Sequence, residues 1–308
     1  MTVHPEIAKV LATLPTPDHS TPPDPVTMRA SEAERVPPLE ERVPLHAVED
    51  VTAATSAGEV PVRIYTPVEA DSYGLLVYFH GGAFFSGSLD THDGVARSLA
   101  KETGHEVVSV GYRLAPESAY PAGLQDCYGV LRWAAEHGAD LKWDGGNLAV
   151  AGDSSGGNFV AGVTAMAHDD GFDRVTHQVL FYPSVDLDFD LDRYASLREN
   201  ARGYGLETDA LKPFNSFYLD SGADPSDPLV SPVKRADLSG LPSALVITAE
   251  YDPLRDEGER YGRRLAEAGV DTRVSRYAGA NHGFVVNFAW LEECYRAFRE
   301  TAEFLKRP

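Results

Sequence analysis

The stretch Asn147-Leu148-Ala149-Val150-Ala151-Gly152-Asp153-Ser154-Ser155-Gly156 decides the fold of this 308-residue chain. Its apolar first half is typical of a buried strand, and residues 158–168, which follow it, are compatible with a helix. A strand, a sharp turn and a helix in this order form a nucleophile elbow, in which the turn lifts a serine hydroxyl clear of the sheet. The two glycines fit this turn, because side chains at their positions would collide within it. The pattern therefore predicts that Ser154 is a nucleophile.

Short apolar runs alternate with helical stretches on both sides of the elbow. The expected strands cover residues 60–65, 75–79, 107–110, 148–151, 179–182, 244–248 and 272–277. The expected helices cover residues 95–102, 124–136, 158–168, 255–268 and 288–304. Near-continuous apolar strands between helices indicate an α/β fold with a mostly parallel sheet covered on both faces.

Donors for an oxyanion are expected directly after the strand at residues 75–79. The segment is His80-Gly81-Gly82-Ala83-Phe84-Phe85, whose small residues let main-chain N–H groups approach a substrate. The N–H of Ser155, next to the nucleophile, supplies a further donor. These residues lie at the carboxyl ends of strands, which is the edge where α/β sheets bind ligands.

A base and an orienting carboxylate complete the requirements of acyl transfer. Asp252 is the preferred carboxylate, because it is the aspartate nearest its strand end, whereas Asp256 and Glu257 would lie in the first turns of the following helix. Of ten histidines, only His282 follows the last expected strand in a glycine-rich loop. The order Ser154, Asp252, His282 is that of α/β-hydrolases and differs from the orders of the chymotrypsin-like and subtilisin-like proteases.

Composition limits the partners. A formal net charge of −20 argues against nucleic acid and anionic membranes, because a negative field repels phosphate. Two cysteines suggest free, buried thiols, and the first ten residues lack the pattern of a secretory signal, so we expect a cytoplasmic protein.

Neither a metal nor another cofactor is expected. The segment Asp90-Thr91-His92-Asp93 has no second cluster with ligand spacing, and we interpret it as a helix cap. No nucleotide-binding glycine motif follows an expected strand.

The chain divides into a core and two covering segments. Residues 1–45 are rich in proline, and we expect them to form an N-terminal cap segment. Residues 186–225 are expected to form a cap insertion. The alternative for this insertion is a solvated connector. Residues 46–185 and 226–308 are the two parts of the core. Phe84, Phe214 and Phe217 are expected to line the substrate pocket.

Five motifs together resemble the bacterial hormone-sensitive-lipase-like esterases of the α/β-hydrolase superfamily over nearly the whole chain. They are His80-Gly81-Gly82-Ala83-Phe84, Tyr112-Arg113-Leu114-Ala115-Pro116-Glu117, Gly152-Asp153-Ser154-Ser155-Gly156-Gly157-Asn158, Asp252-Pro253-Leu254-Arg255-Asp256-Glu257 and His282-Gly283-Phe284. The resemblance implies an eight-stranded sheet with a helical cap. It also implies a triad in which Ser154 is the nucleophile, His282 the general base and acid, and Asp252 the orienting carboxylate.

The same resemblance implies oxyanion donors at Gly82, Ala83 and Ser155, with Gly81 shaping the turn. Two residues depart from the family pattern: Ala83 stands for a third glycine and Ser155 for an alanine. Because the donors are main-chain groups, the mechanism would be kept, although Ala83 narrows the allowed range of φ.

The expected function is hydrolysis of short- to medium-chain carboxylic esters through a Ser-His-Asp acyl-enzyme. Amide, carbamate or lactone hydrolysis by the same triad is the alternative, because the attack chemistry is shared. A non-catalytic binding protein is disfavoured, because the plant gibberellin receptors that resemble this family lack the histidine found here as His282. The expected partner is a small-molecule ester, and an exposed edge strand at residues 272–277 suggests a possible homodimer.

Overall fold

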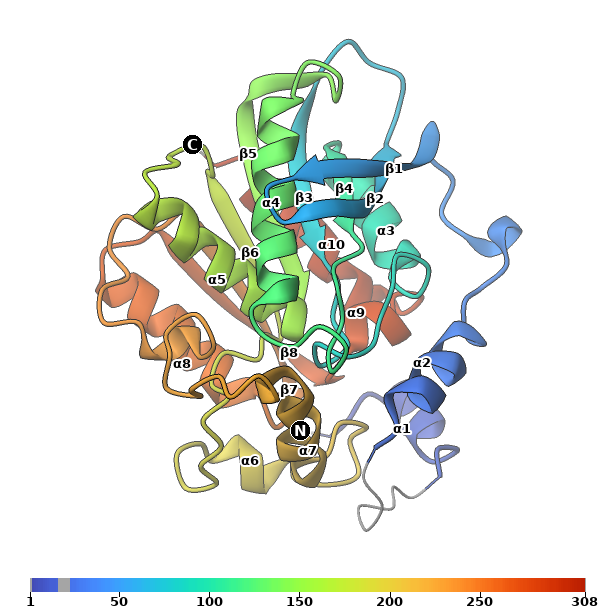
Figure 1. Ribbon diagram of the computed structural model, residues 1–308. Helices are drawn as coiled ribbons and strands as arrows, with labels where there is room; N and C mark the ends of the chain where they lie inside the picture. The colour runs from blue at the N-terminus through green and yellow to red at the C-terminus, as the bar shows by residue number, and fades with distance from the viewer. Residues whose placement is uncertain (1, 16–22, 308) are drawn as a thin grey trace.

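One sheet organises the computed structural model, which describes residues 2–15 and 23–307. Within these residues eight strands lie in the order β1-β2-β4-β3-β5-β6-β7-β8 (Figure 1). They are β1 Ala47–Thr55, β2 Gly58–Thr66, β3 Tyr73–Phe79, β4 Glu106–Val110, β5 Trp143–Asp153, β6 His177–Phe181, β7 Ser243–Tyr251 and β8 Thr272–Asn281. The pairs β1–β2 and β2–β4 are antiparallel and all other neighbours are parallel. The predicted mostly parallel eight-stranded sheet is confirmed.

Strand β1 was missed by the pattern of apolar runs. It forms a hairpin with β2 at the edge of the sheet, and Thr55 pairs with Gly58 at its turn. Only Ala53 of its nine residues is fully buried, while Glu49 and Asp50 are exposed. A strand with so little buried surface leaves no apolar run to detect.

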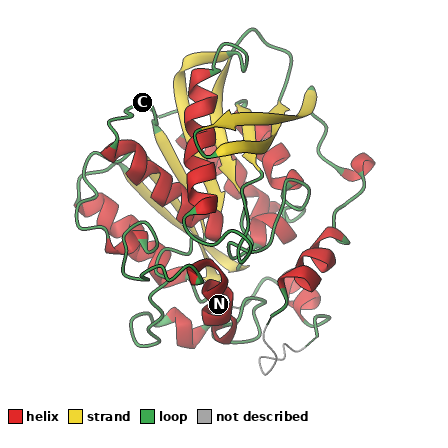
Figure 2. Ribbon diagram, viewed as in Figure 1, coloured by secondary structure: helices red, strands yellow, loops and turns green. Residues whose placement is uncertain are grey.

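Helices cover both faces of the sheet (Figure 2). On one face lie α4 Ala122–Glu136, α5 Ser155–Asp169 and α8 Arg255–Glu267, and on the other α3 Asp93–Thr103, α9 Phe284–Asn287 and α10 Glu292–Phe304. Side chains of β3 alternate between the two cores, because Val77 packs with the first set and Tyr78 with the second. The expected helix at 288–304 begins only at Glu292, since Phe288 and Leu291 enter the core from the turn between α9 and α10.

Two further segments contribute short helices outside the two helical layers that cover the sheet (Figure 1). The first contains α1 Pro5–Leu11, α2 Pro25–Ala33 and the short helix η1 Leu39–Glu41, and the second contains α6 Ser196–Glu199, α7 Thr208–Leu219 and η2 Pro232–Lys234. Figure 1 shows α1, α2, α6 and α7 on the side of the molecule opposite the β1–β2 hairpin. Residues 1 and 16–22 of the expected N-terminal cap segment, and residue 308, lie outside the described residues. Among the described residues, no helix has the length and apolar character needed to cross a bilayer.

Candidate active site

Ser154 lies at the apex of the turn between β5 and α5. Its backbone has φ 55° and ψ −118°, a conformation that L-residues rarely adopt. A Cβ on Gly152 would lie 2.4 Å from the carbonyl oxygen of Gly156, and a Cβ on Gly156 would lie 2.0 Å from that of Phe79. Both glycines are therefore required by close backbone approach, as expected of this kind of turn.

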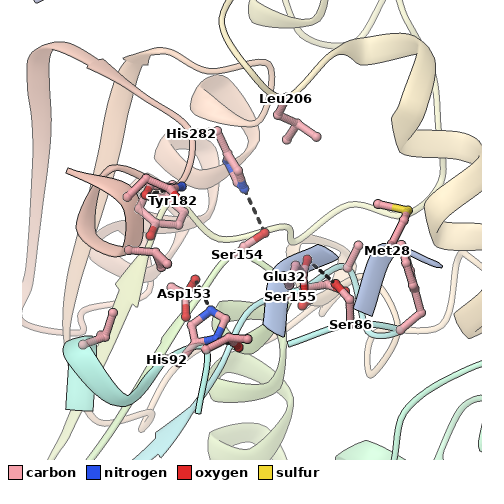
Figure 3. Close-up of a pocket in the computed structure, with 18 of the residues that line it drawn as sticks. Met28, Glu32, Ser86, His92, Asp153, Ser154, Ser155, Tyr182, Leu206 and His282 are labelled. Atoms are coloured by element: carbon pink, nitrogen blue, oxygen red, sulfur yellow. Dashed lines mark hydrogen bonds and ion pairs between the residues drawn. The ribbon is translucent and has the colours of Figure 1, made fainter. Parts of the chain in front are cut away.

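The side chains of Ser154, His282 and Asp252 form a continuous hydrogen-bonded chain. His282 Nε2 lies 3.0 Å from Ser154 Oγ, and His282 Nδ1 lies 2.7 Å from Asp252 Oδ2 (Figure 3 shows the first of these contacts). The Asp252 side chain is fully buried, and its other oxygen accepts a hydrogen bond of 2.9 Å from the Leu254 N–H. The structure thus brings together three residues that the sequence places far apart, in the geometry of a nucleophile, a base and an orienting carboxylate.

The other acidic side chains near Asp252 have different partners. Glu250 accepts a hydrogen bond from the Gly279 N–H, and Asp256 accepts one from the Ser196 N–H. Glu257 accepts from two main-chain N–H groups of the segment after β6, and Glu259 pairs with Arg276. These contacts fix the surrounding loops, which leaves Asp252 as the carboxylate in contact with His282.

The loop after β3 takes an unusual backbone path beside Ser154. Gly82, Ala83 and Phe84 have φ values of 120°, 50° and 67°, and a Cβ on Gly82 would lie 2.3 Å from the Ser86 carbonyl oxygen. In the described part of the chain, the N–H groups of Gly82, Ala83 and Ser155 donate to no protein acceptor. All three residues line the same cavity as Ser154, so their donors are free to bind a substrate oxygen. Gly81 lies beneath them, and its N–H donates to Asp153 Oδ1 at 2.9 Å.

A buried polar cluster supports this loop from below, and sequence reasoning missed it. The Tyr78 hydroxyl donates to Asp153 Oδ1 at 2.5 Å, and His92 Nε2 lies 3.6 Å from Asp153 Oδ2. Tyr112 donates to the carbonyl oxygen of His80 at 2.8 Å and stacks on the His80 ring. The position of Asp153 inside the Gly-Asp-Ser-Ser-Gly motif was the one signal available from sequence.

The charges in this cluster are set by burial and by mutual contact. Burial, reinforced by the nearby His92 ring, lowers the pKa of His80 to about 3, so the imidazole is neutral. Burial acts to raise the pKa of Asp153, but His92 and the Tyr78 hydroxyl outweigh it and keep that pKa below its ordinary value. An ionised Asp153 is a strong acceptor for the Gly81 N–H.

Residues 90–93 lie at the N-terminus of α3, as their interpretation as a helix cap required, but the expected side-chain capping bond is absent at the N-cap residue His92. His92 is the residue before α3, but its side chain makes no capping bond and turns to Asp153 instead. Asp93 pairs with Arg97 within the helix. Among the described residues, no group of three histidine, cysteine or acidic side chains is arranged to hold a metal ion.

A cavity of about 400 Å³ opens above Ser154 and is walled by both covering segments. The N-terminal segment contributes Met28, Glu32, Arg35, Val36 and Pro37, and the segment after β6 contributes Leu206, Leu211, Phe214 and Asn215. Several of these residues, and Tyr182, whose ring centroid lies 4.8 Å from that of His282, were not foreseen.

The three expected pocket aromatics have different environments. Phe84 and Phe214 line the cavity, although Phe84 is 1% exposed and stacks on Tyr218. Phe217 is not among the described residues that line it, and its ring packs against Phe85 at 5.0 Å between centroids.

Comparison with known proteins gives a consistent picture. Residues 76–286 match the model of a protein family described as the alpha/beta hydrolase fold. The chain is 44% identical over 236 residues to carboxylesterase NlhH of Mycobacterium tuberculosis, covering 75% of this chain and 72% of that protein. It is 38% identical over 243 residues to an arylesterase of Saccharolobus solfataricus, covering 79% and 78%. A solved hyperthermophilic esterase from Pyrobaculum calidifontis superimposes with a TM-score of 0.93 at 40% identity, covering 99% of this chain and 98% of that one.

Proposed function

The chain belongs to the hormone-sensitive-lipase-like esterases of the α/β-hydrolase family, and on that premise we propose that it hydrolyses short- to medium-chain carboxylic esters through a Ser154-His282-Asp252 acyl-enzyme mechanism. That it is a carboxylic ester hydrolase follows from its relatives. The proposal concerns the residues that do the chemistry and the size of the substrate. The observation that carries it is the unbroken contact from Asp252 through His282 to Ser154, at the floor of a cavity lined by free main-chain donors.

In the first half-reaction, Ser154 Oγ attacks the ester carbonyl carbon while its proton passes to His282 Nε2. Asp252 accepts from His282 Nδ1–H and stabilises the imidazolium that forms. The carbonyl oxygen becomes an oxyanion, which accepts hydrogen bonds from the N–H groups of Gly82, Ala83 and Ser155. His282 then gives its proton to the departing alcohol, and an acyl-Ser154 remains.

In the second half-reaction a water takes the place of the alcohol. His282 removes a proton from the water, and the resulting hydroxide adds to the acyl carbon of acyl-Ser154. Collapse of the second tetrahedral intermediate returns the proton to Ser154 Oγ and releases the carboxylic acid. Atoms and charges balance without any cofactor.

The cavity supports a small, neutral substrate. A volume of about 400 Å³ is at the lower end of the range of roughly 300–1,000 Å³ for small-molecule sites. The acids Asp90 and Asp93 in its wall are paired with Arg63 and Arg97. Met28, Leu206 and Phe214 give the wall apolar surface, which suits a neutral acyl or alcohol group.

Chain-length profiling with p-nitrophenyl esters from acetate to palmitate tests the substrate class. We expect the highest kcat/KM between acetate and octanoate, and turnover that disappears in Ser154→Ala. An optimum at palmitate, with activation at lipid interfaces, would contradict the proposal. A p-nitroanilide, a carbamate and a lactone with the same acyl group belong in the same panel, because a higher kcat/KM for any of them would favour the alternative chemistry.

We also propose a homodimer that pairs through β8. This strand is last in the sheet order, and Val274 is 39% exposed on it. Its outer edge offers main-chain groups to a second copy of the chain. Light scattering after size exclusion tests this: Val274→Asp should give a monomer while Val68→Asp, on an exposed loop, should not. A wild-type monomer at micromolar concentration would refute it.

A cytoplasmic location remains part of the proposal. Cys127 and Cys294 are both free and buried, which suits a reducing compartment. Fractionation of cells that express the tagged chain would test this location.

A further inference from the structure

Helix α2 rests on the loop that carries two of the proposed oxyanion donors. Its Glu32 accepts two hydrogen bonds from that loop: one from the Gly87 N–H at 3.0 Å and one from the Ser86 hydroxyl at 3.0 Å. The Ser86 hydroxyl also lies 3.0 Å from the Gly82 carbonyl oxygen, so its proton is shared between the two acceptors. Figure 3 shows the contact between Glu32 and Ser86.

Arg29, one helical turn earlier, contacts the same loop at a second point. Its Nε donates to the Phe85 carbonyl oxygen at 2.6 Å, and its Nη2 donates to the Ala115 carbonyl oxygen at 2.6 Å. The guanidinium also forms a two-pronged ion pair with Glu117, at 2.9 and 2.8 Å. The side chain therefore ties the loop to the segment that follows β4.

The loop needs such external support because its backbone is strained. Gly82, Ala83, Phe84 and Gly87 have φ values of 120°, 50°, 67° and 83°. Two of these residues are not glycine, and a left-handed conformation is unfavourable for an L-residue because its Cβ comes too close to the backbone. A conformation of this kind persists only where surrounding contacts fix it.

Helix α2 has little else to attach it to the protein. None of its residues is buried, so its position depends on partly exposed contacts and not on a hydrophobic face. Met28 and Glu32 also line the cavity. The position of α2 and the conformation of the loop are thus linked through Arg29 and Glu32.

We propose that Glu32 and Arg29 are positioning residues that hold the loop at residues 82–87 in the conformation that aims the Gly82 and Ala83 N–H groups at the oxyanion. This inference rests on the proposed function. It adds that the N-terminal segment contributes to catalysis as well as to the cavity wall. Glu32 and Arg29 would lower the free energy of the transition state more than that of the bound substrate, because the N–H donors bind the oxyanion more strongly than the neutral ester carbonyl.

The test compares Glu32→Gln with Glu34→Gln. Both changes remove one negative charge, but Glu34 is exposed just beyond the end of α2 and makes no contact with the loop. The Ser86 hydroxyl donates to one oxygen of Glu32 and the Gly87 N–H donates to the other. A glutamine in the same rotamer places its amide nitrogen, which is a donor, at one of these two positions and so faces a donor with a donor. We expect Glu32→Gln to lower kcat for p-nitrophenyl butyrate about tenfold, below the roughly 10²–10³-fold effect of a whole oxyanion donor, while KM stays within about twofold. Glu34→Gln should keep wild-type values.

A trifluoromethyl ketone supplies the second readout, because its adduct with Ser154 carries an oxyanion. Its inhibition constant should rise in Glu32→Gln by the same factor as kcat/KM falls. An unchanged kcat overturns the proposal, as does a raised KM at wild-type kcat or an unchanged inhibition constant. If Glu32→Gln does not fold, Arg29→Met and Ser86→Ala provide the same comparison. If Ser154→Ala loses turnover while Glu32→Gln keeps the wild-type rate, only this inference is refuted. If Ser154→Ala keeps its turnover, the proposed function is refuted.

Discussion

At the scale of single residues, the site depends on one carboxylate chosen from a dense group of acids. Five acidic side chains lie between residues 250 and 259, and the sequence favoured Asp252 through its place between the strand end and the following helix and through the family resemblance. The structure gives each of the other four a main-chain or arginine partner outside the site, while Asp252 contacts His282 from a fully buried position. The role of an acid in this segment therefore follows from its partner and not from its residue type.

Asp252→Asn should lower kcat by about 10³–10⁴-fold, because an amide cannot orient the imidazole in the tautomer that accepts the serine proton. Steady-state turnover of p-nitrophenyl butyrate measures the loss, with circular dichroism to verify folding. Asp256→Asn is the matched control, since Asp256 contacts Ser196 and Arg255, and it should stay within about threefold of wild type. Equal losses in the two variants would remove Asp252 from the triad.

At the scale of elements, the strand-turn-helix unit around Ser154 tolerates no side chain at its glycines. Gly156 lies on the first turn of α5, where an added Cβ would meet the Phe79 carbonyl oxygen of β3. The Phe79 carbonyl belongs to β3, which pairs with β4 and β5 in the centre of the sheet, and Gly156 is backbone of α5. The two cannot move apart without shifting the helix or disturbing the strand pairing. By contrast, a Cβ on Gly94 of α3 would meet nothing within 4 Å.

Gly156→Ala should therefore destabilise the fold by at least about 3 kcal/mol, at the upper end of overpacking effects. Gly94→Ala should be neutral or up to about 1 kcal/mol stabilising, because alanine is the better helix former. Urea unfolding followed by circular dichroism measures both. Similar stabilities for the two variants would show that the elbow can relax around a methyl group.

Strand β4 contains a buried carboxyl group that makes stability depend on pH. Burial raises the pKa of Glu106 to about 7, against the weaker opposing effect of its hydrogen bond from Thr66. In the described structure its Oε2 has no hydrogen-bond partner. The Glu106 carboxyl has a pKa near 4.5 in the unfolded chain and about 7 in the folded chain. Between these two pH values the unfolded chain gives up the carboxyl proton and the folded chain keeps it. The free energy of unfolding therefore falls as the pH rises from 4.5 to 7.

Glu106→Gln removes the titration and keeps an acceptor for Thr66. The melting temperature of the variant relative to wild type should therefore be higher at pH 8 than at pH 4.5. Differential scanning calorimetry at the two pH values measures the shift, and Glu59→Gln, at an exposed position of β2, should show none. A shift of the opposite sign would mean that Glu106 is stabilised as the carboxylate.

For the molecule as a whole, most strands of the sheet were predictable from sequence, whereas strand β1 and the polar contacts between distant segments were not. The parallel strands were found because strands buried on both faces give continuous apolar runs, as in Leu75 to Phe79. The residues of the proposed triad were selected because each follows an expected strand. Strand β1 was missed for lack of buried side chains, and the contact of His92 with Asp153 was missed because a polar pair between distant segments has no periodic signature.

The same limit applies to the covering segments. The two segments were expected from proline content and from a long connection, but the sequence did not indicate which residues they contact. Nothing in the pattern of residues 25–33 indicates that Arg29 and Glu32 reach the loop after β3, because no periodicity connects segments so far apart in sequence. Phe214 and Phe217 illustrate the same point within the insertion, since both rings pack on Phe85 but only Phe214 lines the cavity.

The central claim is that Ser154 becomes acylated with His282 as its base. A fluorophosphonate forms a stable adduct with an activated serine, so intact-protein mass spectrometry, followed by peptide mapping, tests this claim most directly. We predict one adduct per chain, located on Ser154, with loss of turnover in proportion to labelling and labelling at least about 10³-fold slower in His282→Ala. An adduct on another residue that abolishes activity, or full turnover after complete labelling of Ser154, would contradict the account.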